Sequence, residues 1–172
     1  MINNILKHSL HFIILILLQV LIVRNIYLGS FIILFPYILF ILFLPIELPK
    51  HLVLIFSFLT GVAIDLFYDT AGLHAASCTL IGYLRHFVLK FLSPREGYED
   101  GRTPNSDNMG TVWFITYSGI LIFIHHLCFF YLEIFRINEF FTTLLRVILS
   151  SIGTFGFIYI LQFLFFKSGK QS

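Results

Sequence analysis

Four ionisable residues interrupt long apolar stretches of this sequence, namely Asp65, Arg85, Glu133 and Arg146. A charge at the middle of a bilayer costs about 3 kcal/mol on insertion scales, so such residues usually face protein and pair with one another. Two acids and two bases permit neutral pairs, and we expect Arg146 to pair with either Asp65 or Glu133. Arg85 lies deeper in its stretch, and the sequence leaves its partner open.

Small residues share a helix face with each of these charges. Ser57, Gly61 and Asp65 are each four apart, which places them on one side of a helix. Similar spacings join Ala75, Cys78, Gly82 and Arg85, then Gly119, His126 and Glu133, and finally Arg146, Ser150 and Gly153. Because small residues let helices approach closely in lipid, each charge is predicted to face protein.

Two interpretations of these faces stay open. The five residues Gly61, Asp65, Arg85, Glu133 and Arg146 could be structural, holding the helices of the chain in register. Alternatively, they could line a pocket or a groove for a partner, with a single-span partner helix docking near Gly61 and Asp65.

Nothing in the sequence predicts an enzyme, a cofactor or a metal site. His8 and His11 are three apart on a helix, but no carboxylate joins them, while His125 and His126 are adjacent and point about 100° apart. The chain carries no HExxH, GxSxG or phosphate-binding glycine loop. We therefore predict no catalytic residue, no cofactor and no metal.

The composition excludes most classes of soluble protein. Hydrophobic residues make up 58% of the 172 and charged residues 12%, with a mean hydropathy of +0.92, whereas soluble domains carry about 25% charged residues. A helix needs about 20 apolar residues to cross a bilayer, so six crossings would use most of the chain. No room is left for a separate catalytic or nucleic-acid-binding domain, and a net charge of +2 indicates no nucleic-acid partner.

Apolar runs between polar turns predict an all-α integral membrane bundle of about six transmembrane helices, a single polytopic domain over residues 1–172. The predicted spans are 8–23, 28–46, 51–67, 73–92, 112–135 and 140–166, with one longer loop at 93–110. Prolines at 45 and 49 end the second span. The count would fall to five if residues 8–23 lay along the membrane surface.

The distribution of lysine and arginine predicts the orientation. With six spans, both termini lie on one side together with the 45–50 turn and the 93–110 loop. That side holds Lys7, Lys50, Lys90, Arg95, Arg102, Lys167 and Lys170, while the turns on the other side hold Arg24 and Arg136. Basic residues collect on the cytoplasmic side of membrane proteins, so both termini are predicted to be cytoplasmic.

The stretch from Gly61 to Ala75, GVAIDLFYDTAGLHA, resembles the MreD family of bacterial rod shape-determining membrane proteins. In that family a helix with a Gly-x-x-x-Asp motif ends in a short turn, and the next helix begins with a Gly-Leu-His-Ala-like sequence. Tyr83, Arg85 and the exit from Leu92 to Tyr98 look like the continuation of the same pattern.

The resemblance implies a role without a reaction. Such proteins lie in the bacterial inner membrane beside the single-span protein MreC, in the elongation complex that links the MreB cytoskeleton to peptidoglycan-synthesising enzymes. The family is similar in fold to the substrate-binding subunits of energy-coupling-factor vitamin transporters. The resemblance thus implies a non-enzymatic scaffold for rod shape and peptidoglycan synthesis. The alternative is a small-molecule-binding subunit of a membrane transporter.

Overall fold

The structure is a computed structural model, and it describes residues 2–26, 28–29, 31–99, 103–134 and 137–165. These residues form helices and connections and contain no β-strand. The helices are α1 (Ile2–Leu17), the π-helical η1 (Leu18–Ile22), the 3₁₀ turn η2 (Val23–Asn25), α2 (Ile38–Leu42), α3 (Lys50–Tyr68), α4 (Leu73–Phe91), α5 (Ser106–Met109), α6 (Thr111–Ile134), the 3₁₀ turn η3 (Ile137–Glu139) and α7 (Phe140–Phe165).

Three helices of the described chain are long and apolar enough to cross a membrane. They are α3, α6 and α7, the last counted over Phe140–Phe163. The prediction of a helical protein embedded in a membrane is confirmed at this level. A shorter apolar helix covers Leu10–Asn25, within the rod that α1, η1 and η2 form.

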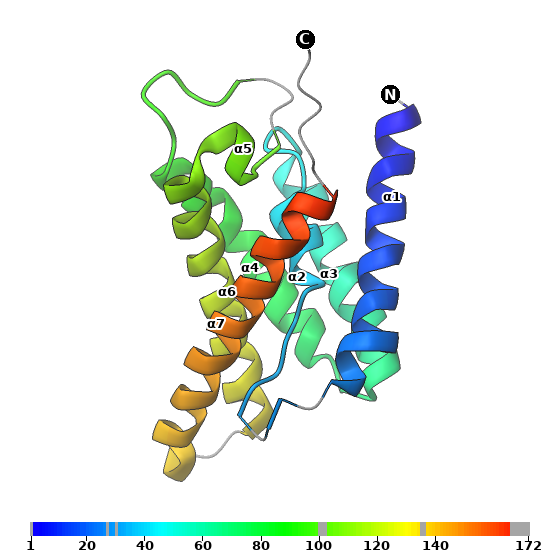
Figure 1. The fold of residues 1–172 in the computed structure, drawn as a ribbon, viewed down its shortest axis with the longest axis vertical. Helices are drawn as coiled ribbons and strands as arrows, with labels where there is room; N and C mark the ends of the chain where they lie inside the picture. The colour runs from blue at the N-terminus through cyan, green and yellow to red at the C-terminus, as the bar shows by residue number, and fades with distance from the viewer. Residues whose placement is uncertain (1, 27, 30, 100–102, 135–136, 166–172) are drawn as a thin grey trace.

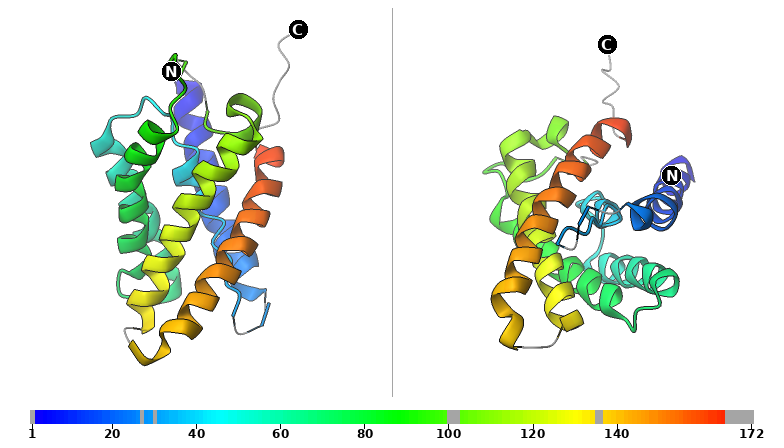
Figure 2. Two further views of the ribbon diagram at one scale, coloured as in Figure 1. Left: turned by 90° about the vertical axis from the view of Figure 1, so that its left-hand side faces the viewer. Right: turned by 60° about the horizontal axis from the view of Figure 1, so that its bottom comes forward.

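The long helices run up and down along one another. α3, α4, α6 and α7 follow in alternating directions, and α1 stands on the other side of the bundle (Figure 1). α1 begins and α7 ends at the same end of the bundle, and we call this the terminal end; the connection between α4 and α5 also lies there (Figure 1). The turn between α3 and α4 lies at the opposite end (Figure 2).

The prediction of one continuous helix over 28–46 is wrong. Among the described residues of this range, α2 is the only α-helix and is five residues long, and residues 31–37 before it have no regular helix. We call residues 31–44 the central segment. Every residue from Leu34 to Leu44, Pro36 included, is buried, so this segment passes through the interior of the bundle.

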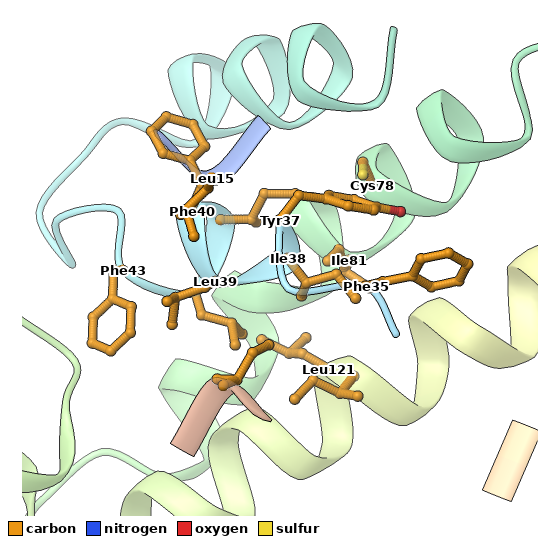
Figure 3. Close-up of a cluster of buried hydrophobic side chains, with 14 of the residues drawn as sticks. Leu15, Phe35, Tyr37, Ile38, Leu39, Phe40, Phe43, Cys78, Ile81 and Leu121 are labelled. Atoms are coloured by element: carbon orange, nitrogen blue, oxygen red, sulfur yellow. The ribbon is translucent and has the colours of Figure 1, made fainter. Parts of the chain in front are cut away.

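Pro36 explains why a helix does not form through this apolar run. A proline inside a helix lacks the backbone N–H of that position and clashes with the carbonyl one turn earlier. The residues after it are apolar on every side, and a helix that is hydrophobic all round belongs in a core. Phe35, Tyr37, Ile38 and Leu39 meet side chains from α1, α4 and α6 in this core (Figure 3).

Described residues of the predicted 93–110 loop contact the helices beside it. It contains α5, which Asn105 caps by accepting a hydrogen bond from the Asn108 backbone N–H. The backbone N–H of Ser106 donates to Gln162 Oε1 of α7 at 3.2 Å. Earlier in the loop, the Tyr98 hydroxyl donates to the Leu89 carbonyl of α4 at 2.7 Å. The connection is therefore held against the terminal end of the bundle.

Candidate functional site

α3 and α4 touch through residues without bulky side chains. A Cβ added at Gly61 would lie 2.3 Å from the Ala75 Cα, and one at Gly82 would lie 2.4 Å from Ser57 Oγ. The sequence prediction that small residues allow close helix packing is confirmed for these positions. The prediction that a partner helix docks on the Gly61 face is wrong, however, because α4 of the same chain already covers that face.

Asp65 caps the first turn of α4. Its Oδ1 accepts hydrogen bonds from the Thr70 hydroxyl and from the His74 N–H at 3.1 Å, and its Oδ2 accepts one from the Ala75 N–H at 2.9 Å. The N-cap residue of α4 is Gly72, which has no side chain to serve these donors. Asp65 thus supplies, from α3, the hydrogen bonds that a serine or aspartate at a helix N-cap usually makes.

His74 extends this contact to the middle of the bundle. The Tyr37 hydroxyl of the central segment lies 2.7 Å from His74 Nδ1 and 2.9 Å from His125 Nε2 of α6. A tyrosine hydroxyl has one proton to donate, so at least one of these two histidine nitrogens carries a hydrogen and donates to it. We call Gly61, Asp65, Thr70, His74 and Ala75 the α3–α4 junction, and Tyr37 links it to the core.

The backbone of the central segment is hydrogen-bonded by side chains of other elements. The Ile33 and Phe35 N–H groups donate to Ser150 Oγ and Thr154 Oγ1 of α7, at 3.0 and 3.1 Å. The Ser150 hydroxyl donates to the Phe31 carbonyl, and Gln19 Nε2 donates to the Leu34 carbonyl. Non-helical backbone at membrane depth requires such partners, since hydrocarbon offers none.

Arg85 is 2% exposed and also serves the central segment. Its Nε donates to the Tyr117 hydroxyl at 2.8 Å, and its Nη2 donates to the Leu44 carbonyl. The Tyr117 hydroxyl donates in turn to the Leu42 carbonyl at 2.9 Å. Arg85 therefore faces protein, as its spacing predicts, and its hydrogen-bond acceptors are neutral oxygens.

The prediction that Arg146 pairs with one of two acids is resolved in favour of Glu133. Arg146 Nη1 lies 3.4 Å from Glu133 Oε2, and its guanidinium lies over the Phe130 ring at 4.6 Å. The pair is partly open, because the Glu133 side chain is 37% exposed. The expectation that all four charges face the interior holds for Asp65 and Arg85 and is wrong for Glu133.

Sequence reasoning missed the polar side chains that hold the central segment. His74 and His125 contact Tyr37, and His126 Nε2 lies 3.1 Å from Thr154 Oγ1. The two adjacent histidines do point to different partners, as expected from a helix. The available signal was Pro36 within a hydrophobic run, which requires side-chain partners for a broken backbone.

Polar residues line cavities at both ends of the described bundle. The first, of about 280 Å³, lies between η1, η2 and the start of the central segment, and its lining includes Gln19, Arg24 and Tyr68; we call it the Gln19 cavity. Gln19 Oε1 is buried and has no hydrogen-bond partner among the described residues. The second, of about 310 Å³, lies between α3 and α4 at the terminal end and is called the Lys50 cavity below.

The arrangement of these polar residues suits them to holding the helices together. Within the described residues, no group of three or more histidine, cysteine, aspartate or glutamate side chains is placed to hold a metal ion. The acceptors of Asp65 and the donors of Arg85 are engaged with the chain itself. Comparisons with protein-family models, with curated protein sequences and with solved structures found no match.

Proposed function

We propose that this protein is a non-enzymatic membrane scaffold of the bacterial cell-elongation complex, contributing to rod shape and to peptidoglycan synthesis through contact with an MreC-like single-span protein. The MreB cytoskeleton and the peptidoglycan-synthesising enzymes are its indirect partners. The observation that carries the proposal is the α3–α4 junction. Residues from both ends of the Gly61–Ala75 stretch, which carries the resemblance to the MreD family, meet there and contact one another.

The contacts of the junction support a structural role for this motif. Gly61 gives α4 room to approach, Asp65 caps α4, and His74 bonds to the central segment. A motif that fixes the angle and register of two helices produces a rigid surface for a partner. These side chains are engaged within the chain, which favours an architectural role over a reaction.

We further propose six membrane passes with both termini in the cytoplasm. The terminal end carries the basic residues Lys50, Lys90 and Arg95, and excess lysine and arginine mark the cytoplasmic side. The central segment would count as the second pass, crossing inside the bundle without one continuous helix. In overall form, such a bundle would be similar to the membrane subunits of energy-coupling-factor transporters.

We propose α7 as the docking surface for the partner helix. Ile152, Gly156 and Ile160 are four apart on one face, and both isoleucines are 64% exposed. A Cβ at Gly156 would meet nothing within 4 Å, so another helix could approach there. This face replaces the Gly61 face in the proposal.

Site-specific crosslinking to a co-expressed MreC-like protein tests this surface. Cysteines at Ile152 and Ile160 should form crosslinks with cysteines in the partner's helix, in a chain whose Cys78 and Cys128 are replaced by alanine. A matched pair at Phe58 and Leu66, also eight apart and at least half exposed on α3, should not. Crosslinks from α3 alone would refute the α7 surface, and failure to co-purify with the partner would refute the scaffold.

A depletion experiment tests the cellular role. Loss of this protein should turn rod-shaped cells round and make them lyse, and the wild-type gene should restore the shape. A variant with Gly156→Trp, which blocks the proposed docking face, should accumulate in the membrane without restoring the rod shape. Rod-shaped growth in depleted cells would contradict the proposal.

The Gln19 cavity favours a second candidate function, that of a small-molecule-binding subunit of a transporter. It lies at the end of the bundle opposite the terminal end, and the proposed topology places that end outside the cell. Its lining combines Arg24, Tyr68 and Gln19 Oε1, which has no hydrogen-bond partner among the described residues. If this function holds, depletion should abolish uptake of a vitamin and leave cell shape unchanged. A change of shape with normal uptake would reject it.

A further inference from the structure

We propose that the Lys50 cavity binds the phosphate of an anionic phospholipid headgroup. It lies between α3 and α4 at the terminal end of the bundle and has a volume of about 310 Å³. Its polar lining is formed by Lys50, Tyr83, Arg85 and His86, and none of the described residues that line it is acidic. This inference does not depend on the scaffold proposal, because it concerns the lipid and not the protein partner.

The buried guanidinium of Arg85 supplies the first argument. Among the described residues its hydrogen-bond acceptors are the Tyr117 hydroxyl and the Leu44 carbonyl, which are neutral and do not balance its charge. A buried cation without a counter-ion is costly in a low-dielectric surrounding. A phosphate in the adjacent cavity would provide the missing negative charge.

The start of α3 supplies the second argument. Its N-cap, Pro49, makes no side-chain cap, and its first turn contains no acidic residue but begins with Lys50. The positive end of a helix dipole is usually accompanied by an acidic group, and a lysine there is unfavourable unless an anion lies close. The cavity therefore receives the positive charge of Lys50 together with the positive end of the α3 dipole. Glu47, in the preceding connection, is exposed and is not part of the lining.

The position of the cavity suits a lipid better than a free ion. Arg85 lies six residues before the end of α4, or about 9 Å along the helix, a depth close to the headgroup region. The cavity extends from the buried residues Val53 and Gly82 to the exposed rings of Tyr83 and Phe87. These outer rings would lie against acyl chains, so a headgroup could enter from the bilayer. Basic pockets between membrane helices on the cytoplasmic side are known to take such headgroups.

Native mass spectrometry of the delipidated full chain in a neutral detergent tests the site. The chain is titrated with phosphatidylglycerol, with phosphatidylcholine and with sodium phosphate. We expect one phosphatidylglycerol to bind about tenfold more tightly than phosphatidylcholine. Lys50→Gln combined with His86→Leu should weaken that binding about 20-fold, because it removes one charge and one hydrogen-bond donor. The matched control Arg95→Gln, which removes an exposed charge from the same end, should change it less than twofold.

Each other outcome would overturn the inference. Equal losses in the cavity variant and in Arg95→Gln would show attraction by diffuse surface charge. Equal binding of both lipids would show that charge does not select the headgroup, and displacement by micromolar phosphate would assign the site to a free anion. A second variant, Leu54→Trp, keeps the charges of Lys50 and Arg85 and fills the cavity. It should also lose the bound phosphatidylglycerol, and retention would contradict a headgroup within the cavity.

Discussion

Replacing Asp65 with asparagine is expected to destabilise the protein far more than the loss of one charge would. The carboxyl group uses both oxygens, with Oδ1 serving Thr70 and the His74 N–H and Oδ2 serving the Ala75 N–H. Asparagine offers one acceptor oxygen. Its amide NH₂ group then faces either the Ala75 N–H or the Thr70 and His74 donors. At least one buried backbone N–H of α4 must then lose its partner.

The magnitude follows from the lost cap. Replacing a helix N-cap costs about 0.5–2 kcal/mol, and the upper part of this range applies because the N–H left unpaired is buried, which costs about 1–3 kcal/mol. We therefore expect the free energy of unfolding to fall by about 2 kcal/mol. Thr70→Val, which removes only the hydroxyl donor to Asp65, should lower it by about 1 kcal/mol.

Asp69→Asn is the matched control for this variant. Asp69 follows Asp65 by four residues, is exposed, and adopts a left-handed backbone conformation with φ of 53°. Asparagine tolerates this conformation as well as aspartate does. The same charge is removed in both variants, so their difference isolates the hydrogen bonds of Asp65.

Equilibrium unfolding in mixed micelles with increasing sodium dodecyl sulfate provides the assay. The single tryptophan, Trp113, donates a hydrogen bond to the Leu92 carbonyl and can report on unfolding by fluorescence, with far-ultraviolet circular dichroism as a second probe. Equal stabilities of Asp65→Asn and Asp69→Asn would refute the capping role. So would an Asp65→Asn protein within about 0.5 kcal/mol of the wild type.

Three further stability measurements in the same assay test the packing and the polar contacts. Gly61→Ala should cost about 1–3 kcal/mol because its Cβ would overlap α4, whereas Gly156→Ala, where the space is open, should be neutral or slightly stabilising; equal effects would contradict the close approach. Thr154→Val should cost about 1–3 kcal/mol by leaving the Phe35 N–H unpaired, and a neutral result would show that this hydrogen bond is dispensable. Glu133→Gln should cost less than about 1 kcal/mol because its ion pair is partly exposed; a larger loss would show that the pair is shielded from solvent.

The long apolar helices and one of their buried faces could be predicted from the sequence. Hydropathy alone located α3, α6 and α7, because each is one uninterrupted apolar helix. The four-residue spacing of Ser57, Gly61 and Asp65 correctly placed all three on a buried face. Helical periodicity says which side of a helix faces protein, and it needs no knowledge of the partner.

The interior could not be predicted in the same way. Residues 28–46 are as apolar as a membrane helix, and hydropathy does not distinguish a helix from an unwound segment that is buried on all sides. The difference depends on Pro36 and on backbone hydrogen bonds to Ser150 and Thr154, which lie more than 100 positions later. The sequence left Asp65 and Glu133 as alternative partners of Arg146, because periodicity gives the face of a helix and not its neighbour.

The dependence of the central segment on α7 has a consequence for the order of events during synthesis. Ile33 and Phe35 leave the ribosome long before Ser150 and Thr154, at sequence separations of 117 and 119 residues. Until α7 has been made, the early segment lacks these side-chain partners and cannot settle in hydrocarbon in its final form. We therefore expect residues 31–35 to reach their final place only after α7 has been translated, and a ribosome-bound chain that ends before α7 should still expose them to aqueous labelling reagents.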